Sequence, residues 1–195
     1  MDNEKEIRPW KILGSEYLFR RPWLTARRDH VQLPNGAENE EFYVLEYPDW
    51  VNVIALTTMG KFVFIRQYRH AIGEIHPELC AGVIDPTDAS PLEAARRELY
   101  EETGYGGGHW EEFCVLAPNP SSQTNRTYTF LATDVEPLST QHLEATEDIS
   151  VHLLTPSEVY RLLAGGDIIQ ALMAAPLWRY FCLNGIPAAD NPAED

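Results

Sequence analysis

Three glutamates, Glu98, Glu101 and Glu102, stand close together in the stretch "ELCAGVIDPTDASPLEAARRELYEETGY", residues 78–105. Carboxylate oxygens are the ligands that hard divalent cations such as Mg²⁺ prefer. The same pattern is also typical of a solvated, charged helix face, because like-charge pairs on a helix cost only a few tenths of a kcal/mol. The cluster therefore indicates either a metal site or an ordinary surface, and its context must decide.

The element that positions these glutamates is predicted to be a helix. Residues 90–93, Ser-Pro-Leu-Glu, form a capping box with proline at the first helical position, and Gly104 is a typical stop. Apolar residues at spacings of three and four predict a stripe that packs on a sheet. Glu98 and Glu102 then lie one turn apart along the edge of this stripe, with Glu101 beside them.

The remaining elements are predicted to be strands with two late helices. Apolar runs within residues 14–47, separated by turn-like segments, predict antiparallel strands. Residues 51–58 and 62–67 flank a short turn and predict a hairpin. Further strands are expected at 113–116, 126–133 and 150–154, and helices at 156–163 and 168–183.

The order of these elements predicts the fold class and the domains. Strands and helices are mixed without regular βαβ alternation, so the expected class is α+β, with α/β/α layers around a mixed sheet. Residues 1–48 are predicted to form an N-terminal β subdomain or arm. Residues 49–195 are predicted to form the main domain.

Composition excludes several classes of function. The net charge of −15 and the lack of a basic patch disfavour nucleic acid as a partner. The longest uncharged runs reach about half of the ~20 apolar residues that a membrane-spanning helix needs. The N-terminus does not resemble a secretory signal, so we expect a cytoplasmic protein with no membrane partner. The three cysteines show no metal-binding spacing and are expected to be free thiols.

The context of the three glutamates matches a known family. Residues 97–105, R-E-L-Y-E-E-T-G-Y, fit the second half of the Nudix box, R-E-U-x-E-E-x-G-U, where U is aliphatic or aromatic, and Gly82 stands where the box has its first glycine. The chain resembles the Nudix hydrolases, and the lead-in E-x-x-A-G at 78–82 resembles the ADP-ribose pyrophosphatase branch. The segments "IRQYRH" (65–70) and "EDISVHLL" (147–154), and Pro120 sixteen residues after Gly104, agree with that branch.

The box departs from the family pattern in its loop. Where the family has G-x5-E-x7-R-E, Asp88 replaces the glutamate and eight residues separate it from Arg97. The family glutamate helps to hold the box together by facing the arginine. Asp88 is shorter by one methylene, and the extra loop residue is expected to restore its reach to Arg97. Cys80 replaces the usual proline, and a small buried side chain is the expected role.

The resemblance also implies the catalytic parts. Mg²⁺ or Mn²⁺ would be held by Glu98 and Glu102, with Glu101 in support and with the carbonyl of Ala81. The general base would come from a late acidic loop, where Glu147 matches the acid near the metal and Glu144 is displaced by one residue from the pattern. An acidic solvated loop is the alternative for that segment.

Substrate contacts are implied less directly. Residues 66 and 69 have opposite parity on a strand, so both arginines cannot face one site unless the strand bends. Arg69 is the expected phosphate contact, with a structural ion pair as the alternative. Glu78 in the lead-in is also expected to be a substrate-binding residue. None of the aromatic residues is assigned to base stacking.

The resemblance implies an activity and an assembly. The expected reaction is metal-dependent hydrolysis of a nucleoside diphosphate linked to a small group, with ADP-ribose or another ADP-sugar as substrate and a nucleoside monophosphate and a sugar phosphate as products. Another nucleotide sugar such as GDP-mannose is one alternative. A ligand-binding Nudix domain without turnover is the other. A homodimer through the N-terminal strands is also implied.

Overall fold

The computed structural model describes residues 6–187, which fall into two compact units. The first unit comprises residues up to Pro48 together with Asn119–Asn125. The second comprises Asp49–Pro118 and the chain from Arg126 onward. Each unit has its own sheet, so each is described by itself.

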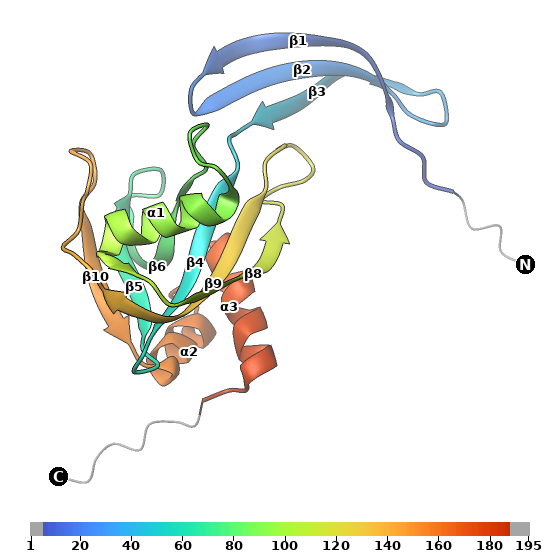
Figure 1. Ribbon diagram of the computed structural model, residues 1–195. Coiled ribbons are helices and arrows are strands. Elements are labelled where there is room, and N and C mark those ends of the chain that lie inside the picture. The colour runs from blue at the N-terminus through green and yellow to red at the C-terminus, as the bar shows by residue number, and fades with distance from the viewer. Residues whose placement is uncertain (1–5, 188–195) are drawn as a thin grey trace, which may run out of the picture. The chain divides into compact units, whose positions relative to one another are not determined.

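The first unit is a three-stranded antiparallel sheet in the order β1-β2-β3 (Figure 1). Its strands are β1 (Lys11–Arg21), β2 (Leu24–Gln32) and β3 (Glu38–Glu46). Residues 119–125 join it through the hydrogen bond from the Leu45 N–H to the Ser122 carbonyl (2.7 Å). The predicted N-terminal strands are confirmed. Every residue of β1 is exposed, although the strand carries several large apolar side chains.

The second unit is built on a mixed sheet in the order β10-β5-β6-β4-β9-β7, with β8 paired to β9. Its strands are β4 (Trp50–Thr57), β5 (Phe62–Arg69), β6 (Glu74–Val83), β7 (Tyr105–Gly106), β8 (His109–Leu116), β9 (Thr127–Pro137) and β10 (Ile149–Leu154). The pair β4–β9 is parallel and the other pairs are antiparallel.

The predicted hairpin of β4 and β5 is wrong beyond its turn. These strands pair only at Leu56 and Phe62, and β6 enters between them. The early part of β6 pairs with β5, and its late part, Cys80–Val83, pairs with β4. The sequence did not predict β6, because Pro77 and the charged residues around it do not resemble a central strand. This strand matters because residues 78–82, which precede the glutamate helix, lie on it.

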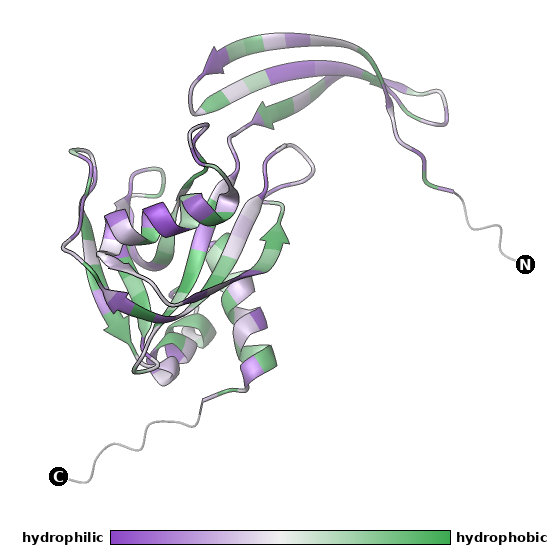
Figure 2. Cartoon of the chain, in the orientation of Figure 1, coloured by the Kyte–Doolittle hydropathy of each residue, from purple (hydrophilic) through white to green (hydrophobic). Residues whose placement is uncertain are grey.

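Three helices cover the two faces of this sheet. The glutamate helix is α1 (Pro91–Thr103), and α2 (Pro156–Gly165) and α3 (Ala171–Asn184) lie on the opposite face (Figure 1). Alternate residues of the strands feed one core under α1 and another under α2 and α3. In Figure 2, α1 carries hydrophilic bands above the sheet, as expected for a helix that buries one stripe. The predicted α+β class with layered helices is confirmed.

No helix within residues 6–187 has both the length and the apolar character needed to cross a bilayer.

Candidate active site

The ends of α1 are set by local chemistry. The Ser90 hydroxyl accepts a hydrogen bond from the Glu93 N–H (3.2 Å), so the predicted start is confirmed. The Glu93 carboxylate does not complete a capping box and pairs with Arg96. Gly104 ends the helix at φ 75°, in the left-handed region, where a Cβ would also collide with the Ser139 carbonyl.

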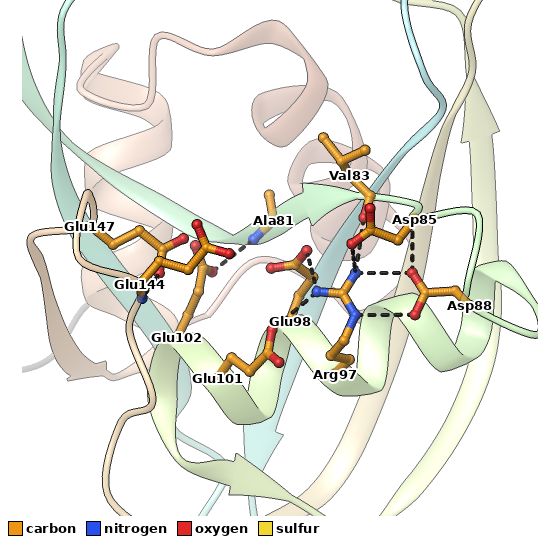
Figure 3. Close-up of polar contacts among 10 residues, drawn as sticks. All are labelled: Ala81, Val83, Asp85, Asp88, Arg97, Glu98, Glu101, Glu102, Glu144 and Glu147. Carbon is orange, nitrogen blue, oxygen red and sulfur yellow. Dashed lines mark hydrogen bonds and ion pairs between the residues drawn. The ribbon is translucent and has the colours of Figure 1, made fainter. Parts of the chain in front are cut away.

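Glu102 is the most deeply buried of the three glutamates. Its residue is 4% exposed, and its Oε2 accepts a hydrogen bond from the Ala81 N–H on β6 (3.1 Å) (Figure 3). The other two are more accessible, since the side chain of Glu98 is 13% exposed and that of Glu101 is 41% exposed. The helix therefore presents two largely buried carboxylates to β6 and one at the rim.

Glu98 depends on the lack of a side chain at residue 82. Its carboxylate lies so close to Gly82 that a Cβ built there would overlap it. The glycine of the box is therefore needed for close approach of a carboxylate to the strand. Ala81 and Gly82 together bring the backbone of β6 against both Glu98 and Glu102.

Burial gives these carboxylates unusual proton affinities. Desolvation, assisted by the negative charges of Glu98 and Glu147, raises the pKa of Glu102 to about 8, against hydrogen bonds from Cys80 and Ala81 that lower it. Desolvation likewise raises the pKa of Glu98 to about 7, although Arg97 opposes this shift. A site that stabilises its carboxylates so poorly as anions would gain from a bound cation. The donor set therefore fits a divalent metal ion.

Arg97 holds the loop of the box to the helix. Its Nε and Nη2 donate to the two oxygens of Asp88 at 3.1 and 2.9 Å, and Nη2 also donates to the Val83 carbonyl (3.0 Å). The hydrogen bonds from Arg97 lower the pKa of Asp88. The expected contact of Asp88 with Arg97 is confirmed, so the lengthened loop compensates for the shorter side chain.

The same guanidinium orients two of the glutamates. Nη1 of Arg97 donates to Glu98 Oε1 (2.9 Å) and to Glu101 Oε2 (3.0 Å), as Figure 3 shows. Arg97 thus lies between the loop carboxylate and the helix carboxylates. Its position explains why Glu101 is turned toward the rim, and it keeps Glu98 beside Gly82.

A single segment before β10 closes the C-terminal end of α1. The Gln141 side chain donates to the Glu102 carbonyl (2.7 Å) and to the Ile149 carbonyl (3.1 Å). The His142 N–H donates to the Glu101 carbonyl (2.8 Å), and its ring stacks on Tyr100 with centroids 5.1 Å apart. These bonds satisfy carbonyls that a helix end leaves without intrahelical partners.

This clamped segment carries the two late acids. Glu144 and Glu147 form a turn in which the Glu144 N–H donates to Glu147 Oε2 (2.8 Å) and the Glu147 N–H donates to the Glu144 carbonyl (3.0 Å). Both residues are exposed, and Figure 3 places them beside Glu102. Glu147 is close enough for its charge to act on the pKa values of Glu98 and Glu102. The structure therefore brings the late acids to the helix glutamates.

Arg69 and Glu78 form an ion pair. Nε of Arg69 donates to Glu78 Oε1 (2.8 Å), and Nη2 also contacts Oε2 of the same carboxylate. Glu78 is 3% exposed, whereas the Arg69 side chain is 37% exposed, so the pair has one buried and one accessible partner. The predicted parity is confirmed: Arg69 lies on the side of the site, whereas Arg66 lines a different cavity with Phe64 and Leu162. The ion pair was the alternative reading for Arg69.

Within residues 6–187, no three His, Cys, Asp or Glu side chains are oriented together so that they could hold a metal ion. Arg97 accounts for this arrangement, because it engages Glu98 and Glu101 on the side away from Glu102. Cys80 lies beneath Glu102, and burial raises the pKa of its thiol well above the ordinary value. It acts as a small packed side chain, as the sequence predicts.

Two family models of known proteins match most of the chain. A family model described as the NUDIX domain matches residues 46–174, and one described as the nucleoside diphosphate sugar hydrolase N-terminal domain matches residues 10–45. The chain belongs to the Nudix family. Both models agree with the predicted class of enzyme, a Nudix hydrolase of nucleoside diphosphate sugars, which is confirmed.

Individual Nudix relatives extend over nearly the whole chain. An ADP-ribose pyrophosphatase of Mycobacterium tuberculosis (strain ATCC 25618 / H37Rv) is 28% identical over 169 residues, covering 85% of this chain and 80% of the relative. An ADP-ribose pyrophosphatase of Bacillus subtilis (strain 168) is 26% identical over 165 residues, covering 84% and 88%. A crystal structure of an ADP compounds hydrolase superposes with a TM-score of 0.79 at 22% identity, covering 94% of this chain and all of that one, which shows the shared fold.

Nudix hydrolases are generally divalent-metal dependent, and the buried glutamates here fit that chemistry. Sequence reasoning missed Gln141 and His142, which clamp the late loop to α1. Their only signal was proximity to the acids at 144 and 147, because a glutamine that spans two carbonyls has no sequence motif. It also missed Asn52 on β4 and Thr127 on β9, which line a cavity together with Ala81 and Gly82 of the box.

Proposed function

We propose that this Nudix enzyme hydrolyses the diphosphate of ADP-ribose or another ADP-sugar, with Mg²⁺ or Mn²⁺ as cofactor. The observation that carries the proposal is the pair of buried carboxylates, Glu98 and Glu102, held against Ala81 and Gly82 at the end of a clamped acidic loop. The names of the two ADP-ribose pyrophosphatases support the choice of substrate.

The division of labour follows from burial and charge. Glu98 and Glu102 would hold the metal with the carbonyl of Ala81, and Glu101 would support them from the rim, either directly or through water. When bound, the metal supplies positive charge that neutralises the diphosphate oxygens and makes water more acidic. Arg97 keeps the carboxylates and the loop in place and does not contact the substrate.

The general base would come from the late acidic turn. Glu147 lies near enough to the helix glutamates to assist metal binding, and Glu144 would accept the proton of the attacking water. The helix glutamates are unsuited to this role while they ligate metal, because a base needs a free lone pair. Attack of water on one phosphorus then breaks the bridging P–O bond and releases AMP and a sugar phosphate.

Arg69 is proposed to orient the substrate. Its ion pair with Glu78 fixes the guanidinium beside the cavity that begins at Ala81, and its side chain is 37% exposed. An arginine held in this way can meet an anionic phosphate without losing further side-chain entropy. Glu78 would act as the buried support for that contact.

A homodimer is proposed for the assembly, with residues 1–48 as the dimerisation arm and 49–195 as the hydrolase domain. The strand β1 exposes Ile12, Leu18 and Phe19, which are 57, 47 and 43% exposed. Apolar strand surface of this extent is typical of an interaction site.

The test of substrate class is a comparison of kcat/KM for ADP-ribose, other ADP-sugars, GDP-mannose and dinucleotides, with Mg²⁺ or Mn²⁺ present. We expect ADP-ribose or another ADP-sugar to give the highest value. A higher value for GDP-mannose would redirect the proposal to a different nucleotide. Nucleotide binding without turnover of any of these compounds would identify a ligand-binding Nudix domain.

A further inference from the structure

A small cavity of about 300 Å³ lies at the C-terminal end of β6. Ala81 and Gly82 line it, and these are the residues against which Glu102 and Glu98 lie. A diphosphate held at those glutamates would therefore have one of its ends at this cavity. The volume is near the lower limit of ligand pockets, about 300 Å³, so it suits a single ring and not a whole nucleotide sugar.

The floor of this cavity contains polar atoms without partners. Asn52 on β4 and Thr127 on β9 line it, and they are 1% and 2% exposed. Within residues 6–187, Asn52 Oδ1 and Thr127 Oγ1 make no hydrogen bond. Leaving a buried polar atom unpaired costs about 1–3 kcal/mol, so a ligand that pairs with such atoms at a cavity wall would gain binding free energy.

The orientation of the Asn52 amide is fixed. Its Nδ2 donates to the carbonyl of Leu172 at the start of α3 (2.7 Å). Since a carbonyl can only accept, the nitrogen must face Leu172 and the oxygen must remain on the other side. Asn52 therefore presents a pure acceptor to the cavity, and a ligand group that pairs with it must be a hydrogen-bond donor.

This requirement separates the possible ligand groups. A phosphate dianion has no hydrogen to donate and would be repelled by Oδ1. A sugar hydroxyl donates one hydrogen and accepts others, and Thr127 Oγ1 can take either role. Gln170 and Leu172 at the start of α3 line the same wall, and within residues 6–187 the Gln170 side chain makes no cap bond to the helix. The wall thus matches neighbouring hydroxyls that both donate and accept.

We propose that this cavity is the subsite for the sugar of a nucleoside diphosphate sugar, with Asn52 and Thr127 as the residues that recognise its hydroxyls. The inference rests on the proposed function, since the diphosphate must lie at Glu98 and Glu102. It adds two specificity-determining residues that lie outside the Nudix box, on β4 and β9.

The variant Thr127→Val tests the subsite, because it removes the hydroxyl and keeps the branched shape. Thr129→Val is the matched control: Thr129 is fully buried on the same strand, and its Oγ1 also lacks a partner within the described chain, but it does not line the cavity. Neither change removes a hydrogen bond of the folded protein, so both variants should fold. Asn52 is less suitable, since it also holds α3.

The assay compares ADP-ribose with the methyl ester of ADP, which keeps the nucleotide and lacks the sugar. We expect Thr127→Val to raise KM for ADP-ribose by about tenfold, the effect of leaving one hydroxyl unpaired, with kcat nearly unchanged. It should leave the methyl ester unaffected, and Thr129→Val should leave both substrates unaffected.

Equal effects of Thr127→Val on both substrates would place the nucleotide in the cavity and overturn the proposal, as would equal KM values for all three proteins. If the wild type binds ADP-ribose but hydrolyses neither substrate, the proposed function fails separately. The subsite is then judged by the dissociation constant of ADP-ribose from calorimetry. An unchanged constant in Thr127→Val would overturn it, and a constant raised about tenfold for that variant alone would support it.

Discussion

Glu102 is a carboxylate that folding removes from water without giving it a positive partner of its own. Its hydrogen bonds come from neutral groups, the Ala81 N–H and the Cys80 thiol, and Arg97 in the box engages Glu98 and Glu101 instead. Burial of this kind is costly unless a cation or a proton compensates for it. The burial of Glu102 is therefore consistent with the proposed role of metal ligand, because a bound cation would offset the free-energy cost of burying its charge.

The first prediction concerns Glu102 itself. We expect Glu102→Gln to lower kcat for ADP-ribose by about 100-fold or more, because the site loses charge that holds the metal. Folding should be preserved, since glutamine keeps the shape and an acceptor for the Ala81 N–H. The measurement is initial rates as a function of Mg²⁺, with circular dichroism as control. Wild-type rates in this variant would refute the metal assignment.

The second prediction concerns pH and metal together. The pKa values of Glu98 and Glu102 in the folded chain are about 7 and about 8, above the ordinary 4.5. Between pH 4.5 and these raised values, the metal-free folded chain therefore binds more protons than the unfolded chain. Stability should therefore fall as pH rises through this window, and each pKa unit corresponds to about 1.4 kcal/mol. Added Mg²⁺ should restore stability at high pH by replacing the protons.

Calorimetric Tm values at about pH 5 and about pH 8, with chelator, measure this effect. The net charge of −15 adds a general repulsion at high pH, so the double variant Glu98→Gln/Glu102→Gln serves as reference. The wild type should lose more Tm than the reference between the two pH values. Equal losses would contradict the pKa assignment.

The third prediction separates the two late acids. Both Glu144→Gln and Glu147→Gln should lower kcat, but only Glu147→Gln should raise the Mg²⁺ concentration needed for half-maximal rate. Glu147 is the one whose charge reaches the helix glutamates. Metal titrations of the two variants give the answer, and identical curves would show that their roles are not divided in this way.

At the scale of elements, the site forms where three segments of the backbone meet. The strand β6 brings Ala81 and Gly82, α1 brings the glutamates, and residues 138–149 return to cap the helix. Gln141 is central to this arrangement, because its side chain donates hydrogen bonds both to the Glu102 carbonyl and to the Ile149 carbonyl at the start of β10. It acts as a positioning residue for Glu144 and Glu147.

The fourth prediction follows from that tie. Gln141→Ala should lower kcat by about tenfold and raise the metal requirement, because the late turn loses its register on α1, whereas KM for the nucleotide should change little. Gln141→Glu cannot donate to the carbonyls and should behave like the alanine variant. Wild-type metal titration curves in both variants would show that Gln141 only supports stability.

The sequence determined α1 and its caps well, because a serine cap, a proline at the first turn and a terminal glycine act locally. It also predicted that Glu98 and Glu102 lie one turn apart on α1 and that Asp88 contacts Arg97. It failed where structure depends on distant segments: β6 separates β4 from β5, and Gln141 meets α1 across many residues. Asn52 and Thr127 were missed for the same reason, since they lie on the distant strands β4 and β9, whose parallel pairing sets Thr127 opposite Trp50, two residues before Asn52.

At the scale of the whole molecule, the acidic surface and the exposed β1 strand have different consequences. The excess of acids repels anionic ligands in general, so substrate capture depends on the metal and on a few arginines such as Arg69. The apolar side chains of β1 are exposed in the single chain. We therefore expect a second copy of the chain to cover them.

The fifth prediction tests that assembly. Leu18→Glu should convert a dimer to a monomer, because it places a charge within the apolar part of β1. Lys11→Glu on the same strand is the control, since it changes a residue that is already polar and exposed. Light scattering after size-exclusion chromatography measures the mass. A monomeric wild type, or a dimeric Leu18→Glu protein, would contradict the role of β1.

The most direct test of the account is the identification of products formed from ADP-ribose by the wild-type protein, with Mg²⁺ and with chelator. The buried glutamates and the clamped acidic turn predict AMP and ribose 5-phosphate in equal amounts with Mg²⁺, and neither product with chelator. Undiminished product formation in chelator would contradict the role assigned to Glu98 and Glu102. Intact ADP-ribose in both conditions would contradict hydrolysis of this substrate.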